Sequence, residues 1–149
     1  MPARATGCTF CTIVAGETPA AVVCEDASTL AFLDHRPLFP GHCLLIPRAH
    51  VETLGDLPVD LIEPLFANAQ RLSRAVEQAM EAEGSFVALN NRVSQSVPHL
   101  HVHIVPRRRK DGLRGFFWPR TKYEDDAHLE RVRAAIAAAL VEPLAPSAR

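Results

Sequence analysis

The chain carries almost no net charge, because its 16 lysines and arginines are balanced by 17 acidic residues, which leaves a formal charge of -1. Such a balance gives no overall attraction to nucleic acid or to an anionic membrane, so we expect neither as a partner. The chain also lacks an apolar run long enough to cross a bilayer, and residues 1–20 lack the basic start and apolar stretch of a signal peptide. We therefore expect a soluble cytoplasmic protein.

Internal repeats and linker-like segments are also missing from the sequence. A chain of 149 residues with 48% hydrophobic composition is long enough to bury one sizeable core. We expect a single domain over residues 1–149, with residues 1–6 and 142–149 as mobile tails because they are featureless or rich in alanine, proline and serine.

Cysteine is present four times, which is too few and too unevenly spaced for a disulfide framework in a chain without a secretion signal. Cys24 and Cys43 lie in apolar segments and are predicted to be small core residues. Cys8 and Cys11 form Cys-Thr-Phe-Cys, a spacing that lets two thiolates bind one zinc ion or form a redox dithiol. A redox pair is expected near a βαβ pattern, which the sequence does not contain.

Short apolar segments bounded by glycine, proline, aspartate or asparagine predict five strands, at residues 21–24, 29–33, 43–47, 86–90 and 100–106. A long helix is predicted over residues 60–83, with Gly84 as its stop, because apolar residues recur there every three or four positions. A second helix is predicted over residues 126–141, and both apolar stripes are expected to face the core. These elements indicate an α+β fold with a mostly antiparallel sheet.

The most informative segment is His99-Leu-His-Val-His103. Its period of two is a strand pattern, so the three imidazoles share one face while Leu100, Val102 and Ile104 take the other. Imidazole titrates near neutrality, attacks as a nucleophile and binds metals. Three imidazoles on one face therefore favour chemistry over packing, and the pattern alone leaves a metal site and a nucleophile both open.

Four blocks in order identify a resemblance that covers nearly the whole chain. Gln95-Ser-Val followed by the histidine run resembles the histidine triad (HIT) family of nucleotide-binding hydrolases and transferases. The other matching blocks are residues 8–13, 31–37 and 41–50. The likeness is greatest to the zinc-containing bacterial branch, which implies an antiparallel sheet of about five strands that extends across a two-fold axis into a homodimer.

The resemblance divides the histidines between two roles. It implies a structural zinc ion held by Cys8, Cys11, His50 and His99, which is a closed tetrahedral set. It implies that His101 is the nucleophile and that His103, His42 and Ser96 are further active-site residues. It also implies nucleotide contacts from a set of pocket residues: Phe10 and Ile13 around the base, Asp34 on the ribose hydroxyls, Asn91 or Asn90 on sugar or phosphate, and Gln95 and Ser96 on the phosphate or leaving group.

The expected activity is therefore hydrolysis at the α-phosphate of a purine nucleotide conjugate of the nucleoside phosphoramidate type. A nucleotidyl-histidine intermediate forms, and nucleoside monophosphate is released. One alternative is cleavage of dinucleoside polyphosphates by water or by phosphate. Another is a nucleotide-binding regulatory protein with incidental hydrolysis. A metalloenzyme with His99, His101 and His103 as three catalytic ligands is the least supported alternative.

One segment departs from the family pattern, and two others are further candidates for a functional role. Only Arg92-Val-Ser94 stand where family members commonly carry a longer loop with glycines, so Arg92 is a candidate to replace backbone contacts to phosphate electrostatically. The basic run at residues 107–110, with Arg114, is either a solvated loop or a clamp for distal phosphates. The aromatic residues 116–118 are candidates to cap the site or to complete a partner subunit's pocket.

Overall fold

The computed structural model describes residues 4–113 and 120–140, so part of the predicted tails and the aromatic segment at 116–118 lie outside the described residues. The chain divides into two units, which are described separately, and the boundary falls between Arg109 and Lys110. In the described part of the chain, no helix is long and apolar enough to cross a membrane.

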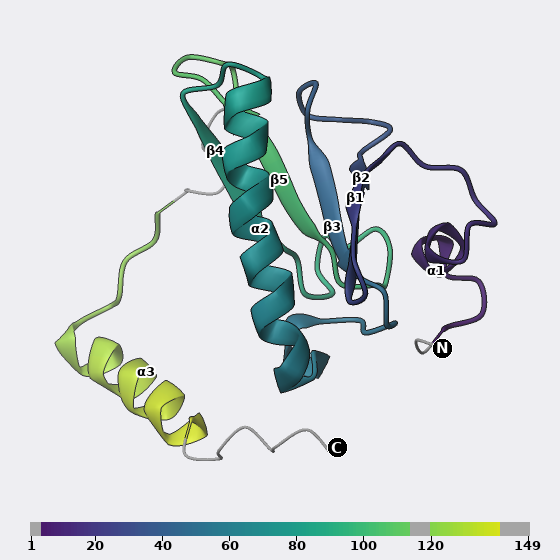
Figure 1. Cartoon of the computed structure of the whole chain (residues 1–149). Helices are drawn as coiled ribbons and strands as arrows, with labels where there is room; N and C mark the ends of the chain where they lie inside the picture. Colours follow the sequence, from purple (N-terminus) through teal and green to yellow (C-terminus); the bar gives the residue numbers. More distant parts are fainter. Residues whose placement is uncertain (1–3, 114–119, 141–149) are drawn as a thin grey trace. The chain divides into compact units, whose positions relative to one another are not determined.

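The first unit is built on one antiparallel sheet of five strands in the order β1-β2-β3-β5-β4 (Figure 1). The strands are β1 (Val22–Glu25), β2 (Thr29–Leu33), β3 (Cys43–Pro47), β4 (Gly84–Ala88) and β5 (Val102–Arg107). The helices are α1 (Thr9–Val14), a 3-10 helix (Leu54–Asp56) and α2 (Val59–Ala79). The predicted α+β class and antiparallel sheet are thus confirmed.

Each face of the sheet packs against a different helix. The long helix α2 covers one face with the apolar stripe predicted for it, burying Leu65, Ala69, Leu72 and Val76 against side chains of β2, β3 and β5. The opposite face forms a second, smaller apolar cluster with α1. This cluster contains Cys8, Phe10, Cys11, Leu30, Phe32, Leu44 and Ile46.

The histidine run follows the predicted alternation across these two faces. Leu100, Val102 and Ile104 are buried in the α2 cluster. On the opposite side the ring of Phe10, from α1, contacts both His99 and His101. Sheet pairing begins only at Val102, so the alternation extends three residues upstream of the strand itself.

Several predicted boundaries differ from the structure. Helix α2 ends at Ala79 rather than at residue 83, because the chain turns at Met80 and Glu81, and Glu81 has a positive φ of 51°. Gly84 therefore begins β4 instead of stopping the helix, and β4 ends at Ala88, before the predicted limit. The short helices α1 and Leu54–Asp56 were not predicted, since six and three residues carry too little periodicity.

The second unit contains α3 (Asp126–Ala139), which agrees with the helix predicted from residue 126. Its N-terminus is capped by Asp125, whose carboxylate accepts a hydrogen bond from the backbone N–H of His128 at 2.7 Å. Within this unit Leu129, Ile136 and Leu140 are exposed, and the expectation that their stripe faces the core stays a prediction. Among the described residues, this unit has no second helix or strand against which α3 could bury that face.

Gly41 provides a test of how the turn before β3 is built. Its φ of +98° lies in the region that favours glycine, and a Cβ there would lie 2.6 Å from Met80 Cγ. We expect Gly41→Ala to lower the free energy of unfolding by about 2–3 kcal/mol, since backbone strain adds to a steric clash. Gly16→Ala is the matched control, because Gly16 also has a positive φ but open space around it, and it should cost about 1 kcal/mol. Urea unfolding measures both, and equal losses would contradict this account.

Candidate active site

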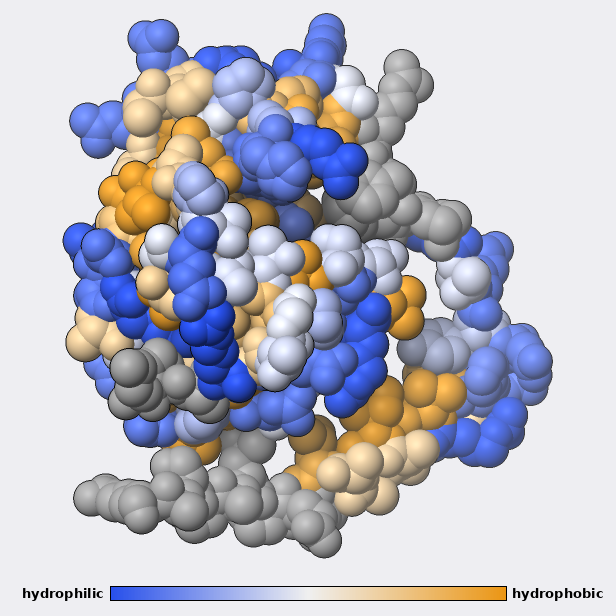
Figure 2. Space-filling model, turned by 90° about the vertical axis from the view of Figure 1, so that its right-hand side faces the viewer, coloured by the Kyte–Doolittle hydropathy of each residue, from blue (hydrophilic) through white to orange (hydrophobic). Residues whose placement is uncertain are grey.

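A cavity of about 1180 Å³ lies between α1 and the sheet face that carries the histidines. Phe32, Leu44 and His103 form one row across β2, β3 and β5, because each is paired with the next in the sheet register, and all three line the cavity. Phe10 and Ile13 of α1 line it as well. Figure 2 views the side of the molecule on which α1 lies and shows apolar residues among hydrophilic ones. The cavity lining combines apolar side chains with several polar ones, as in small-molecule sites.

His101 is held in one tautomer by the backbone. Its Nδ1 lies 2.7 Å from the carbonyl oxygen of His99, and a carbonyl can only accept, so Nδ1 of the neutral ring carries the hydrogen. The lone pair is therefore on Nε2. The side chain is 4% exposed and lines the cavity, so His101 presents an oriented, unprotonated ring nitrogen of the kind that can attack an electrophile.

Two consecutive hydrogen bonds orient His42 and His103. The backbone N–H of Leu38 donates to His42 Nδ1 at 3.1 Å, which leaves the hydrogen of the neutral ring on Nε2. His42 Nε2 lies 3.0 Å from His103 Nδ1 and donates to it. His103 therefore carries its own hydrogen on Nε2 and can donate to an oxygen of a bound molecule. His42 lies behind His103 and orients it.

Burial keeps these two imidazoles neutral. It lowers the pKa of His103 to about 4, and nearby His101 and His42 add to the shift while Asp34 opposes it. Burial also lowers the pKa of His42, again against Asp34, whose Oδ2 lies 3.7 Å from His42 Nδ1. Both rings are thus uncharged at neutral pH, as the tautomers described above require.

Two groups of side chains in the described part of the chain bring metal-ligand atoms together, and the three triad histidines are not among them as a set. This geometry contradicts the least supported alternative, in which His99, His101 and His103 bind one catalytic metal. The group of Asp34, His42 and His103 is close enough, but His42 Nδ1 and His103 Nδ1 already accept hydrogen bonds. We therefore assign that group to orientation of His103.

The other group consists of Cys8, Cys11, His50 and His99, the four residues predicted to bind zinc. Cys8 Sγ lies 3.5 Å from His99 Nδ1, and Cys11 Sγ lies 3.4 Å from His50 Nδ1 and 3.7 Å from His99 Nδ1. The two Nδ1 atoms are 3.3 Å apart. Zinc bond lengths give a tetrahedron with edges of about 3.6 Å between sulfur and nitrogen and about 3.4 Å between nitrogens. The four donor atoms thus fit a zinc ion.

The protonation of His99 supports the same conclusion. Its Nε2 donates to the carbonyl oxygen of Pro47 at 2.9 Å, so the lone pair of Nδ1 points at the two sulfurs and His50. Burial is the main cause that lowers the pKa of His99 to about 4, so the ring is neutral, as a metal ligand must be. Cys8 and Cys11 are also buried. Two buried thiols, the buried and oriented His99 and the half-buried His50 form a donor set that fits a structural zinc site.

Most of the residues predicted to contact nucleotide come together in the cavity. Its lining includes Phe10, Ile13, Asp34, Ser96, His101 and His103. Asn91 and Gln95 are not part of this lining among the described residues. Asn91 Oδ1 accepts a hydrogen bond from the backbone N–H of Leu54 at 2.9 Å, and Gln95 Nε2 donates to the carbonyl oxygen of Glu52 at 2.7 Å. Their nucleotide contacts stay predictions.

The shortened loop achieves a tight turn without glycine. Arg92 and Ser94 have positive φ angles of 66° and 61°, which non-glycine residues seldom adopt. The side chain of Gln95 stabilises this turn, because its Oε1 accepts a hydrogen bond from the backbone N–H of Arg92 at 2.8 Å. Arg92 does not line the cavity, so its proposed electrostatic role toward phosphate has no support from this geometry.

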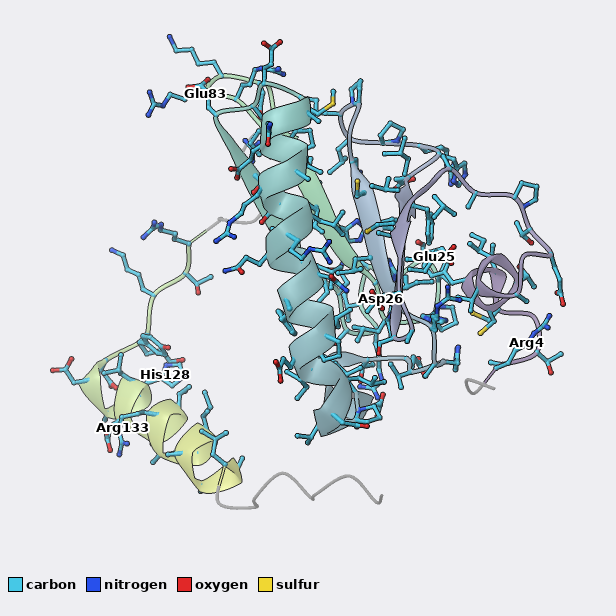
Figure 3. The ribbon with its side chains drawn as sticks, in the orientation of Figure 1. Arg4, Glu25, Asp26, Glu83, His128 and Arg133 are labelled. Atoms are coloured by element: carbon cyan, nitrogen blue, oxygen red, sulfur yellow. The ribbon has the colours of Figure 1, made fainter. Side chains whose placement is uncertain are left out.

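The basic run at residues 107–110 lies at the far end of β5 from His101, about 20 Å away by strand rise. Arg109 Nε is 3.8 Å from the carboxylate of Glu83, which Figure 3 shows at the start of β4, and Arg108 donates to the carbonyl oxygen of Met80. Arg107, Arg108 and Arg109 do not line the cavity. This geometry gives no support to a phosphate clamp at His101, and the role of the run stays a prediction.

Some functional residues escaped the sequence analysis. Phe32 and Leu44 form the floor of the cavity, and pairing the predicted strands in register would have found them, since both alternate onto the histidine face. The backbone groups of Leu38 and Pro47 fix the tautomers of His42 and His99, and no sequence pattern identifies such backbone groups. His35 and Arg36 line the cavity beside Asp34, and the sequence analysis assigned them no role.

Comparison with known proteins places the chain in a family. The HIT domain model matches residues 15–110, so the chain belongs to the HIT family. It is 39% identical over 108 residues to an uncharacterized HIT-like protein of Mycobacterium tuberculosis, covering 71% of this chain and 75% of that protein. A crystal structure of a Bacillus subtilis HIT family member superposes with a TM-score of 0.83 at 34% identity, covering 92% of this chain and 99% of that one.

Other similar proteins have more specific names. A zinc-bound histidine triad protein from Mycobacterium smegmatis has a TM-score of 0.68 at 36% identity, covering 89% of this chain and 95% of that one. An adenosine 5'-monophosphoramidase of Candida albicans is 33% identical, covering 75% of this chain and 78% of the relative. A bis(5'-nucleosyl)-tetraphosphatase of Schizosaccharomyces pombe is 36% identical but covers only 54% and 46%. Hydrolases of nucleotide conjugates thus occur among the relatives.

The lowered pKa of His103 predicts how stability depends on pH. Unfolded His103 takes up a proton near pH 6.5, whereas folded His103 does so only near pH 4. The unfolded state therefore binds more protons between these values, and the free energy of unfolding falls as the pH is lowered through this window. Urea unfolding of His103→Asn should show a smaller fall than the original protein from pH 7 to pH 4.5. His35→Asn is the control, since the His35 side chain is 88% exposed, and its fall should be unchanged. Equal falls in all three proteins would contradict the assignment.

Proposed function

We propose that this protein hydrolyses a purine nucleotide conjugate at its α-phosphate through a nucleotidyl-His101 intermediate. The observation that carries the proposal is the tautomer of His101, whose Nδ1 is occupied by the carbonyl oxygen of His99 at 2.7 Å. A neutral imidazole with a free and oriented Nε2 is a competent nucleophile at neutral pH. Membership in a family with nucleotide-conjugate hydrolases supports the same reaction.

The reaction divides into two displacements. The Nε2 lone pair of His101 attacks the α-phosphorus, a P–N bond forms, and the bond to the leaving group breaks as that group takes a proton from solvent. Water then attacks the same phosphorus and gives a proton back to solvent, the P–N bond breaks, and the electron pair returns to His101 with release of nucleoside monophosphate. His103 Nε2–H and the Ser96 hydroxyl are placed at the cavity to donate hydrogen bonds to the phosphate oxygens or the leaving group.

The remaining cavity residues would bind the nucleoside. Phe10, Ile13, Phe32 and Leu44 offer apolar surface for the base, and such surface selects weakly between bases. Asp34 is the carboxylate of the lining and would accept hydrogen bonds from the ribose hydroxyls. A phosphoramidate-type substrate, as named for the Candida albicans relative, is favoured over a dinucleoside polyphosphate. A polyphosphate needs several cations for its distal charges, whereas Arg36 is the single arginine or lysine of the described cavity lining.

The proposal includes one structural zinc ion on Cys8, Cys11, His50 and His99, supported by the tetrahedral spacing of the donor atoms and by the zinc-bound Mycobacterium smegmatis relative. It also includes a homodimer. Strand β4 is an edge strand of the described sheet, and a second copy would extend the sheet at this edge. Analytical ultracentrifugation decides the oligomeric state.

Replacing the proposed nucleophile is the direct test of the reaction. We expect His101→Ala to lower kcat on adenosine phosphoramidate by about 10³-fold or more, because the covalent route is lost. Mass spectrometry after rapid acid quenching should detect an added nucleotidyl group on the original protein and none on the variant. His128→Ala, in α3, is the control and should keep the original rate. Turnover by His101→Ala at the rate of the original protein would disprove the assignment.

Metal content provides a separate test. Inductively coupled plasma mass spectrometry should find one zinc per chain, and Cys11→Ser should lose most of it because a neutral hydroxyl replaces a thiolate ligand. Cys24→Ser is the matched control, since Cys24 lies on β1 outside the ligand group, and it should keep one zinc per chain. Zinc retained at full occupancy by Cys11→Ser would show that the site is wrongly assigned.

A further inference from the structure

We infer that a metal ion bound at the four-residue group holds α1 in place as one wall of the nucleotide pocket, and we call this arrangement a latch. Two of the four ligands come from the α1 segment, and the same segment lines the cavity. Metal occupancy would then set the affinity for nucleotide, and Phe10 would act as a positioning residue that transmits this to His101. The inference rests on the proposed function for the ligand, but its structural part can be measured without any nucleotide.

Apart from the possible metal ligands, few contacts attach α1 to the sheet. The helix has six residues, and Phe10 and Cys11 are its buried ones. The side-chain hydrogen bonds described between residues 4–20 and the rest of the protein are the sulfur contacts of Cys8 and Cys11 with His50 and His99. Phe10, together with Ile13 and Val14, adds apolar contacts to the sheet. A six-residue helix is not stable alone, so its place on the sheet depends on the sulfur contacts and on this apolar packing.

The hydrogen bonds of this segment otherwise close it on itself. Arg4 donates to the carboxylate of Glu17 at 2.8 Å, and Figure 3 shows Arg4 beside α1. Thr12 and Thr18 are joined through their hydroxyls at 2.7 Å, and the backbone N–H groups of Glu17 and Thr18 both donate to the carbonyl oxygen of Thr12. These contacts give the segment an internal shape. They do not hold it to the strands, so this shape can move as a unit.

Phe10 contacts one residue of the metal-ligand group, His99, and one residue of the cavity, His101. Its ring centroid lies 5.9 Å from that of the metal ligand His99 and 5.2 Å from that of His101, with edge-to-face angles of 71° and 85°. It also packs edge-to-face on Phe32 in the cavity floor at 5.5 Å. Displacing α1 therefore removes one wall of the cavity and the ring that packs against His101 in a single movement.

The part of the fold packed under α2 does not depend on the metal-ligand group. The main core lies on the opposite face of the sheet, where α2 packs on β2, β3 and β5 with none of the four ligands among its members. The α1 cluster is separate from that core. Loss of the metal should therefore loosen residues 8–18 while the sheet and α2 remain folded, which is local opening and not global unfolding.

Hydrogen exchange measures this directly on the full chain, compared with zinc bound and after removal of zinc with a chelator. We expect amides of residues 8–18 to exchange at least tenfold faster without zinc, while those of α2, β2 and β3 keep their protection. Cys8→Ser should reproduce the zinc-free pattern, and Cys24→Ser should behave like the zinc-bound protein. Unchanged exchange at residues 8–18, or loss of protection across the whole chain, would overturn the inference.

The nucleotide arm uses AMP as the probe, with its Kd measured by isothermal titration calorimetry. We expect Kd to rise at least tenfold when zinc is removed. Phe10→Ala should also raise Kd and lower kcat while keeping one zinc per chain, and Phe10→Leu should recover part of both. Equal AMP affinity with and without zinc would overturn the latch even if exchange changed. Absence of AMP binding to either form would instead refute the proposed function, and the exchange result would still decide the structural part.

Discussion

One buried hydrogen bond, from His99 Nε2 to the carbonyl oxygen of Pro47, fixes the orientation of the His99 ring, and both residue groups of the site depend on this orientation. It turns the Nδ1 lone pair of His99 toward Cys8, Cys11 and His50, where four donor atoms meet at tetrahedral spacing. The carbonyl oxygen of His99 in turn accepts from His101 Nδ1. A single residue thus belongs to the group of possible metal ligands through its ring and fixes the tautomer of His101 through its backbone carbonyl.

The division between the two roles follows from the geometry of an extended chain. Residues two apart share a face, so His99, His101 and His103 lie on one side, where Phe10 of α1 contacts the first two, while Leu100, Val102 and Ile104 join the core under α2. The same alternation on β2 and β3 places Phe32 and Leu44 beside His103 in the cavity lining. The cavity and the group of possible metal ligands therefore share one sheet face and one short helix.

The sequence predicted the strands, the long helix and the grouping of the four metal ligands, because these depend on periodicity or on motifs with a known resemblance. It could not predict the tautomers, since the groups that select them are the backbone N–H of Leu38 and the carbonyl oxygens of Pro47 and His99. It predicted α3 and its apolar stripe, but an amphipathic pattern does not say which part of the protein covers such a stripe. The local contacts of Asn91 and Gln95 depend on a loop whose shape arises from two strained residues.

The central claim is that backbone groups hold the imidazoles in defined tautomers, and nitrogen-15 NMR of the histidine rings in the zinc-loaded protein at pH 7 tests it most directly. The account predicts a neutral His101 with its hydrogen on Nδ1, and neutral His42 and His103 with theirs on Nε2. It also predicts His99 with hydrogen on Nε2 and metal on Nδ1. A His101 ring with its hydrogen on Nε2 would leave no lone pair facing the cavity and would contradict the account.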